Sequence, residues 1–157
     1  MQKAHLSRIN KEIKELQLEP LQGITLTQDS DNIHMWEGKL DGPEGTFYHG
    51  FVLEVKIVLS ENYPLEAPIV HFKHPLFHPN VSTSGSICLD ILKAQWSPTL
   101  TIGKVMLSLS SLLNDPNPSS ALNSEAAMLW NKNKNSYGDK VIEICNKYCK
   151  KSVSISN

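Results

Sequence analysis

Hydrophobic residues recur at helical spacing near the start of the chain. Between Ala4 and Leu18, polar and charged residues alternate with an apolar stripe formed by Leu6, Ile9, Ile13 and Leu16. A stripe with this period is typical of an amphipathic helix packed on a core. We therefore predict a helix from Ala4 to Leu18, ending before Pro20.

Four segments then show the β-branched residues and partial alternation of strands: 24–28, 33–40, 51–59 and 69–72. Turn-forming residues separate the first three, in "DSDN" and "DGPEG". Short intervals of this kind favour antiparallel neighbours. The pattern therefore predicts a four-stranded antiparallel meander.

A long loop and three helices complete the predicted order. No sustained period appears over 73–98, and compact domains seldom carry loops beyond about 12–15 residues without a function. Apolar spacing then predicts a helix over 102–113, capped by Thr99 or Thr101 and stopped by prolines. Further helices are expected over 123–130 and over 136–151, the last with Ser136 as its cap. The segregation of strands and helices indicates an α+β fold. We expect one domain over 1–151, followed by a polar, frayed tail over 152–157.

Composition limits the kinds of partner. The chain has 157 residues with 40% hydrophobic content and a formal net charge of -1, so nothing suggests the basic surface of a nucleic-acid-binding protein. No segment resembles a signal peptide or a membrane span, which predicts a soluble protein of the cytoplasm or nucleus without membrane contact. Three cysteines, unevenly spread, argue against a disulfide framework and leave free thiols.

Cys88 lies inside the long loop, and the residues alone leave its role open. Burial as an inert thiol is the commonest fate of a free cysteine. A nucleophile would need a nearby cation, helix N-terminus or base, yet Lys93 is the nearest basic residue in sequence. A cysteine hydrolase would need a base and an orienting residue, with His71, His74 or His78 and Asp90 as candidates.

Zinc binding is a weaker alternative. His71, His74, His78 and Cys88 form an acceptable ligand inventory, but two of these histidines precede prolines, which favour turns. Cys145 and Cys149 are four residues apart on a predicted helix and are more simply explained as core residues.

Asn80 and Asp90 could also take part in chemistry. A side-chain amide aimed at a reacting carbonyl can stabilise an oxyanion, although an asparagine after a proline also forms turns. Asp90 could help to deprotonate an amine or accept hydrogen bonds from loop amides.

The motifs "YPLEAP", "HPN", "GSICLDIL", "QWSP" and "LLNDPNP", in this order, resemble the ubiquitin-conjugating enzyme family. The resemblance extends from about Ala4 to Lys150. It implies an N-terminal helix, a four-stranded antiparallel sheet, an active-site loop and C-terminal helices, the same order as that predicted from the residue pattern.

The resemblance also implies roles for individual residues. Cys88 would carry the C-terminal carboxyl of ubiquitin as a thioester. His78 and Pro79 would brace the loop, and Asn80 would support the loop or polarise the thioester carbonyl. Asp90 matches an acidic position near the thiol, and Ser120 lies where the family has a residue at the gate to the active site.

Partner surfaces follow by the same resemblance. The activating enzyme and ligases of the RING, U-box or HECT kinds would contact the first helix and two loops, through Arg8, Lys11, Leu65, Ser97, Pro98 and Thr99. Many members have an aromatic residue in place of Leu65, and a basic one is common in place of Glu66, so these departures leave the choice of ligase open. Donor ubiquitin would contact Lys104, Leu107 and Ser111.

The resemblance implies no bound metal or organic cofactor, because ATP is used by the upstream activating enzyme. Expected partners are ubiquitin, the activating enzyme, ligases and substrate proteins, and the chain is expected to be a monomer. Two alternatives remain at this point: a carrier for another ubiquitin-like modifier, and a non-catalytic scaffold of the same fold. The joint presence of Cys88 and Asn80 argues against a scaffold.

Overall fold

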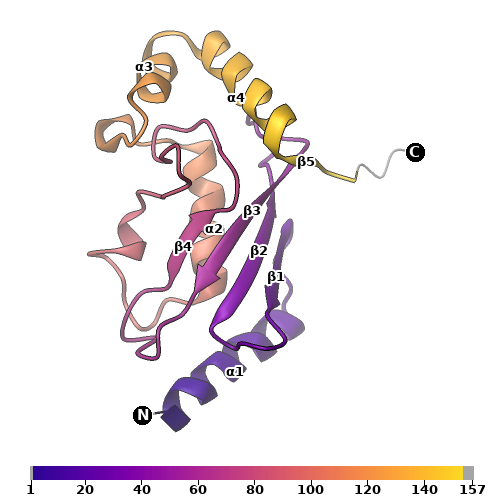
Figure 1. Cartoon of the computed structure of the whole chain (residues 1–157), viewed down its shortest axis with the longest axis vertical. Helices are drawn as coiled ribbons and strands as arrows, with labels where there is room; N and C mark the ends of the chain where they lie inside the picture. The colour runs from indigo at the N-terminus through magenta and orange to yellow at the C-terminus, as the bar shows by residue number, and fades with distance from the viewer. Residues whose placement is uncertain (1, 154–157) are drawn as a thin grey trace.

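The computed structural model describes residues 2–153 and has the predicted element order, with a central sheet and helices around it (Figure 1). Helix α1 (Gln2–Leu18) is followed by four strands: β1 (Ile24–Gln28), β2 (Met35–Asp41), β3 (Phe51–Val58) and β4 (Ile69–Phe72). The strands pair in sequence order, each antiparallel to the next. The α+β fold and the meander are therefore confirmed.

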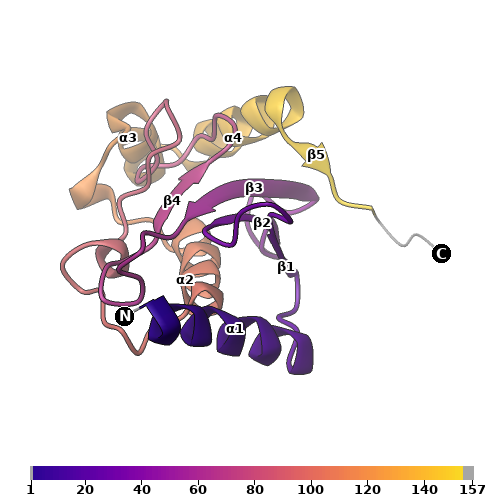
Figure 2. The ribbon, with the colours of Figure 1, turned by 60° about the horizontal axis from the view of Figure 1, so that its bottom comes forward.

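The helices after the sheet are α2 (Ile102–Asn114), α3 (Ser124–Lys132) and α4 (Lys134–Tyr148), with single 3-10 turns at η1 (Asp90–Leu92) and η2 (Pro118–Ser120). Figure 2 shows α1 at one end of the sheet, with α3 and α4 at the opposite end. No helix among residues 2–153 combines the length and apolar character needed to cross a membrane.

The core lies between the sheet and α2. Alternate residues of β3 are buried, and Leu53, Val55 and Ile57 are completely so, which stabilises the fold by about 1.5–3 kcal/mol for each side chain. Helix α2 lies close to β2 because Gly38 has no side chain, and a Cβ atom there would collide with Met106. The sheet thus fixes α2, which in turn supports the long loop.

Two predicted boundaries are wrong. The strand expected from residue 33 begins at Met35, because Asn32 forms a turn in which its carbonyl accepts from the Met35 amide at 3.1 Å. The helix expected over 136–151 is α4, whose cap is Asn133 instead of Ser136. The Asn133 side chain accepts a hydrogen bond from the Ser136 amide at 3.1 Å.

The end of the chain also differs from the prediction. Helix α4 stops at Tyr148, and Lys150–Lys151 forms a short strand, β5, that pairs with Phe51 and Val52 of β3. Of the tail expected to be frayed, Ser152 donates its amide hydrogen to the Gly50 carbonyl at 2.8 Å. Residues 154–157 of that tail lie outside the described residues.

Candidate active site

Cys88 follows a small hairpin in the long loop. Val81 and Ile87 pair as an antiparallel bridge, and the Cys88 amide donates to the Asn80 carbonyl at 2.8 Å. Cys88 is partly exposed, and one residue, Leu89, separates it from η1. The thiol is therefore held by backbone hydrogen bonds at a position that a large partner can approach.

The hairpin is attached to the edge strand β4. Ser86 bridges to His71, and the Phe72 amide donates to the Gly85 carbonyl at 2.9 Å. Gly85 has a φ of +90°, and a Cβ atom there would collide with the Phe72 carbonyl. Glycine meets both requirements of this close approach.

His78 braces the loop against α2. Its Nε2 donates to the Leu112 carbonyl at 2.8 Å, and its Nδ1 accepts from the Asn80 amide at 2.9 Å. Burial lowers the pKa of His78 to about 4, although the hydrogen bond to Leu112 opposes this effect. The ring is therefore neutral near pH 7, in the tautomer that satisfies both contacts.

Asn80 joins the loop to the segment before α3. Its Nδ2 donates to the carbonyls of Asn117 at 2.8 Å and Ser120 at 3.1 Å, while its Oδ1 accepts from the Asn117 amide at 2.8 Å. The Pro79 carbonyl accepts from the Leu122 amide at 2.8 Å. Because Asn80 is completely buried and both of its amide hydrogens are used, this arrangement favours loop support over contact with a reacting carbonyl.

Asp90 and Ser120 are exposed on the two loops that these contacts connect. The Asp90 Oδ1 accepts from the Ile91 amide at 2.8 Å, a local contact within η1. Ser120 is held through its backbone carbonyl by Asn80, which also accepts from the Cys88 amide. Asn80 thus connects Ser120 to Cys88, and Ser120 stays exposed.

Two of the histidines considered for a hydrolase or a zinc site make other contacts. His78 binds the backbone of Leu112 and Asn80, and His74 lies 3.6 Å from the sulfur of Cys149. Among residues 2–153, no group of three His, Cys, Asp or Glu side chains is placed to hold a metal ion. Neither alternative gains support from the geometry.

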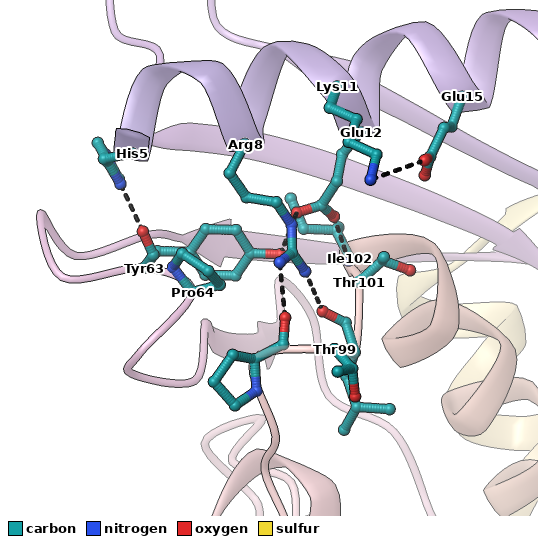
Figure 3. A network of polar contacts seen from close by, with 12 residues as sticks. His5, Arg8, Lys11, Glu12, Glu15, Tyr63, Pro64, Thr99, Thr101 and Ile102 are labelled. Carbon is teal, nitrogen blue, oxygen red and sulfur yellow. Dashed lines mark hydrogen bonds and ion pairs between the residues drawn. The ribbon is translucent and has the colours of Figure 1, made fainter. Parts of the chain in front are cut away.

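Arg8 has a structural use on the predicted partner surface. Its guanidinium donates to the carbonyls of Pro98 at 2.6 Å and Leu100 at 2.5 Å, and its Nε donates to Glu12 at 3.0 Å (Figure 3). One side chain thereby ties α1 to the loop that precedes α2.

Glu12 is the buried centre of this network, although in sequence it is one of the charged residues between the apolar positions of α1. Its carboxylate accepts from Arg8, from the Tyr63 hydroxyl at 2.5 Å and from the Ile102 amide at 2.8 Å (Figure 3). Burial, together with this contact, raises the pKa of Tyr63 well above its usual range. The signal in the sequence is the position of Glu12 three residues after Ile9, on the border of the apolar stripe.

Several predicted contact residues are available around this network. Leu65 is 68% exposed, and Pro98, Thr99 and Lys11 are exposed, while Ser97 is half-buried. The two loops are joined by Trp96, whose indole donates to the Pro64 carbonyl at 2.9 Å. The network therefore fixes the positions of Leu65 and of the loop that contains Pro98 beside α1.

Two of the three predicted donor-ubiquitin contacts lie around one shallow hollow. Leu107 and Ser111 of α2 line it with Leu89, the residue after Cys88. Lys104 is exposed one turn earlier on the same helix. The hollow therefore runs between the loop of the thiol and the exposed face of α2.

Comparison with known proteins agrees with this geometry. Residues 8–145 match the family model described as "Ubiquitin-conjugating enzyme". Over 137 residues the chain is 44% identical to the Arabidopsis thaliana protein "Ubiquitin-conjugating enzyme E2 3", an alignment that covers 87% of this chain and 91% of that protein. The chain therefore belongs to the ubiquitin-conjugating enzyme family, whose members are transferases that act through a cysteine thioester.

Proposed function

We propose that Cys88 accepts the C-terminal carboxyl of ubiquitin as a thioester from the activating enzyme and transfers it to substrate lysines with a ligase. The observation that carries this proposal is a partly exposed thiol on a loop fixed by Asn80, His78 and the β4 hairpin. A thiol that meets two large partners in turn needs access more than a deep pocket.

The chemistry consists of two acyl transfers. In the first, the Cys88 sulfur attacks the thioester carbonyl on the activating enzyme, whose cysteine leaves as a thiolate. In the second, a lysine amine attacks the new carbonyl, an amide forms, and the Cys88 thiolate leaves while the amine loses a proton. Since a thiolate is a good leaving group, the chain can carry the acyl group in a reactive form without a bound cofactor.

The surrounding residues divide this work. His78 and Asn80 act as positioning residues, because their side chains bind backbone groups on α2 and η2. Asp90 and Ser120 expose a carboxylate and a hydroxyl on the connected loops, where an incoming lysine could be oriented. Donor ubiquitin packs on the hollow beside Leu107.

Ligases and the activating enzyme dock on α1 and the two loops joined to it. Leu65 and Pro98 supply exposed apolar contacts, and Lys11 supplies charge. Arg8 and Glu12 hold these contacts in place through the backbone of residues 98–102.

A loading assay with activating enzyme, ubiquitin and ATP tests the proposal. We expect a ubiquitin adduct on the wild-type chain that thiol reductant removes. Cys88→Ser should give a reductant-resistant oxyester or no adduct, and Cys149→Ser, a matched substitution at another partly exposed cysteine, should load normally. Loading with a different ubiquitin-like modifier and not with ubiquitin would support a carrier for that modifier, and an unchanged adduct on Cys88→Ser would refute the role of Cys88.

A further inference from the structure

A second cluster of nucleophilic side chains lies at the junction of α4 and β5. Cys149 is the C-terminal cap of α4, and its amide donates to the Cys145 carbonyl at 2.8 Å. Cys145 is completely buried, whereas Cys149 is partly exposed. The Cys149 sulfur lies 3.6 Å from Nδ1 of His74, so the cluster combines two thiols and an imidazole.

The hydrogen bonds of His74 define what it can offer the sulfur. Its Nε2 accepts from the Glu54 amide at 3.0 Å, which leaves the ring hydrogen on Nδ1. That nitrogen faces both the Pro75 carbonyl at 2.9 Å and the Cys149 sulfur. His74 therefore provides an N–H to a thiolate, and it could take up the thiol proton only by losing the bond to Glu54.

The neighbouring groups shift the pKa of Cys149 in both directions. Contact with the Cys145 thiol lowers the pKa of Cys149 against the effect of burial, and the contact with His74 contributes in the same direction. The same contact between the two thiols, together with burial, raises the pKa of Cys145. The Glu54 carboxylate raises the pKa of Cys149, but it also forms ion pairs with Lys39 at 3.8 Å and Lys150 at 3.7 Å, which offset its negative charge. The cluster as a whole favours the thiolate of Cys149.

The cluster is separate from the surfaces described above. In both Figure 1 and Figure 2 the junction of α4 and β5 lies at the end of the sheet opposite α1. Neither His74 nor Cys149 takes part in the hydrogen bonds that brace Cys88. Modification here would leave the residues of the carrier reaction in place.

We propose that Cys149 is a peroxide-reactive thiol, a modification site distinct from Cys88, and that Cys145 resolves its oxidised form. In the first step the Cys149 thiolate attacks one oxygen of hydrogen peroxide. An S–O bond forms, the O–O bond breaks, the sulfur is oxidised to sulfenic acid, and the hydroxide that leaves becomes water with the proton that the Cys149 thiol released when it ionised. In the second step the Cys145 thiol attacks this sulfur, an S–S bond forms, and the sulfenic oxygen leaves as water with the thiol proton.

Oxidation of the Cys88→Ser protein by hydrogen peroxide, followed by peptide mass spectrometry, tests both steps. We expect an intramolecular Cys145–Cys149 disulfide, with a mass loss of two hydrogens. In a protein that also carries Cys145→Ser, dimedone should label Cys149 as the trapped sulfenic acid. Dimedone labelling on Cys145 with Cys149 left unlabelled in the Cys88→Ser protein, or no oxidation of either cysteine while the protein stays folded, would overturn the proposal.

The rate of alkylation tests the part played by His74. At pH 6, Cys149 should react with iodoacetamide several-fold faster than an unperturbed reference thiol of pKa about 8.5, because its lowered pKa gives it a larger thiolate fraction. His74→Gln keeps an acceptor for the Glu54 amide but removes the ring N–H, so it should reduce this advantage while the contact with Cys145 keeps the remainder. His71→Gln, three residues earlier on β4, serves as the matched control and should leave the alkylation rate of Cys149 unchanged. An equal rate for Cys149 in the wild type and in His74→Gln would show that His74 does not activate the thiol.

Discussion

Replacing Asn80 by alanine removes the side chain that connects the loop of Cys88 to η2. Three hydrogen bonds are lost, two to the carbonyls of Asn117 and Ser120 and one from the Asn117 amide. The Cys88 amide still has its acceptor, because that bond uses the Asn80 backbone carbonyl. The substitution thus frees the second loop and leaves the backbone of the hairpin intact.

The structure sets the size of the effect. A typical intramolecular hydrogen bond contributes about 0.5–1.5 kcal/mol net, so the loss of these three should lower the free energy of unfolding by about 3 kcal/mol. With a urea dependence of about 1–3 kcal/mol per molar for a small domain, the unfolding midpoint should fall by about 1–3 M. Discharge of ubiquitin to free lysine should slow in the same protein, because Ser120 and its loop lose their fixed position.

Urea unfolding and single-turnover discharge, measured on the same preparation, separate support from direct catalysis. Ser119→Ala is the matched control, since its hydroxyl donates to the exposed Asn117 side chain at 2.7 Å and does not reach Asn80. It should change stability by less than about 0.5 kcal/mol, as surface substitutions usually do. If Asn80→Ala unfolds at the wild-type urea concentration but discharges slowly, Asn80 acts on the reacting carbonyl and the positioning argument is refuted.

Three further predictions follow from individual contacts. Burial lowers the pKa of His78 from 6.5 to about 4, so the unfolded chain takes up a proton there before the folded chain does. The free energy of unfolding should therefore fall by about 2–3 kcal/mol between pH 6.5 and pH 4.5. If a folded His78→Gln protein shows the same pH dependence of urea unfolding as the wild type, this prediction is wrong. Gly85→Ala should abolish loading by displacing the hairpin from Phe72, and loading at the wild-type rate would show that the backbone can adapt. Arg8→Ala should weaken ligase-dependent transfer and lower stability, with Lys11→Ala as an exposed control; an equal loss in both would point to charge instead of loop support.

Elements with a strong local period could be predicted from the sequence. The alternation of β3 and the apolar stripe of α2 are properties of short segments, and the structure has both close to the predicted bounds. The end of α4 could not be predicted in the same way. Lys150 and Lys151 form a strand because the edge of β3 lies beside them, and their own side chains carry no signal for it.

The order of the motifs predicted which residues surround Cys88. It did not predict which hydrogen bonds each of their side chains makes. Whether Asn80 faces the sulfur or η2 depends on where Asn117 and Ser120 lie after folding. Glu12 was missed because its partners Tyr63 and Ile102 are distant in sequence, so a buried acid looked like part of a solvated face.

Transfer from isolated, ubiquitin-loaded chain to free lysine tests the central claim most directly. After loading, ATP is removed and lysine is added, and the reductant-sensitive adduct is followed over time. We expect ubiquitin to leave Cys88 at a rate that rises with lysine concentration and to appear as ubiquityl-lysine. Loss of the adduct by hydrolysis alone, at a rate independent of lysine, would contradict the proposed transfer of ubiquitin from Cys88 to an amine.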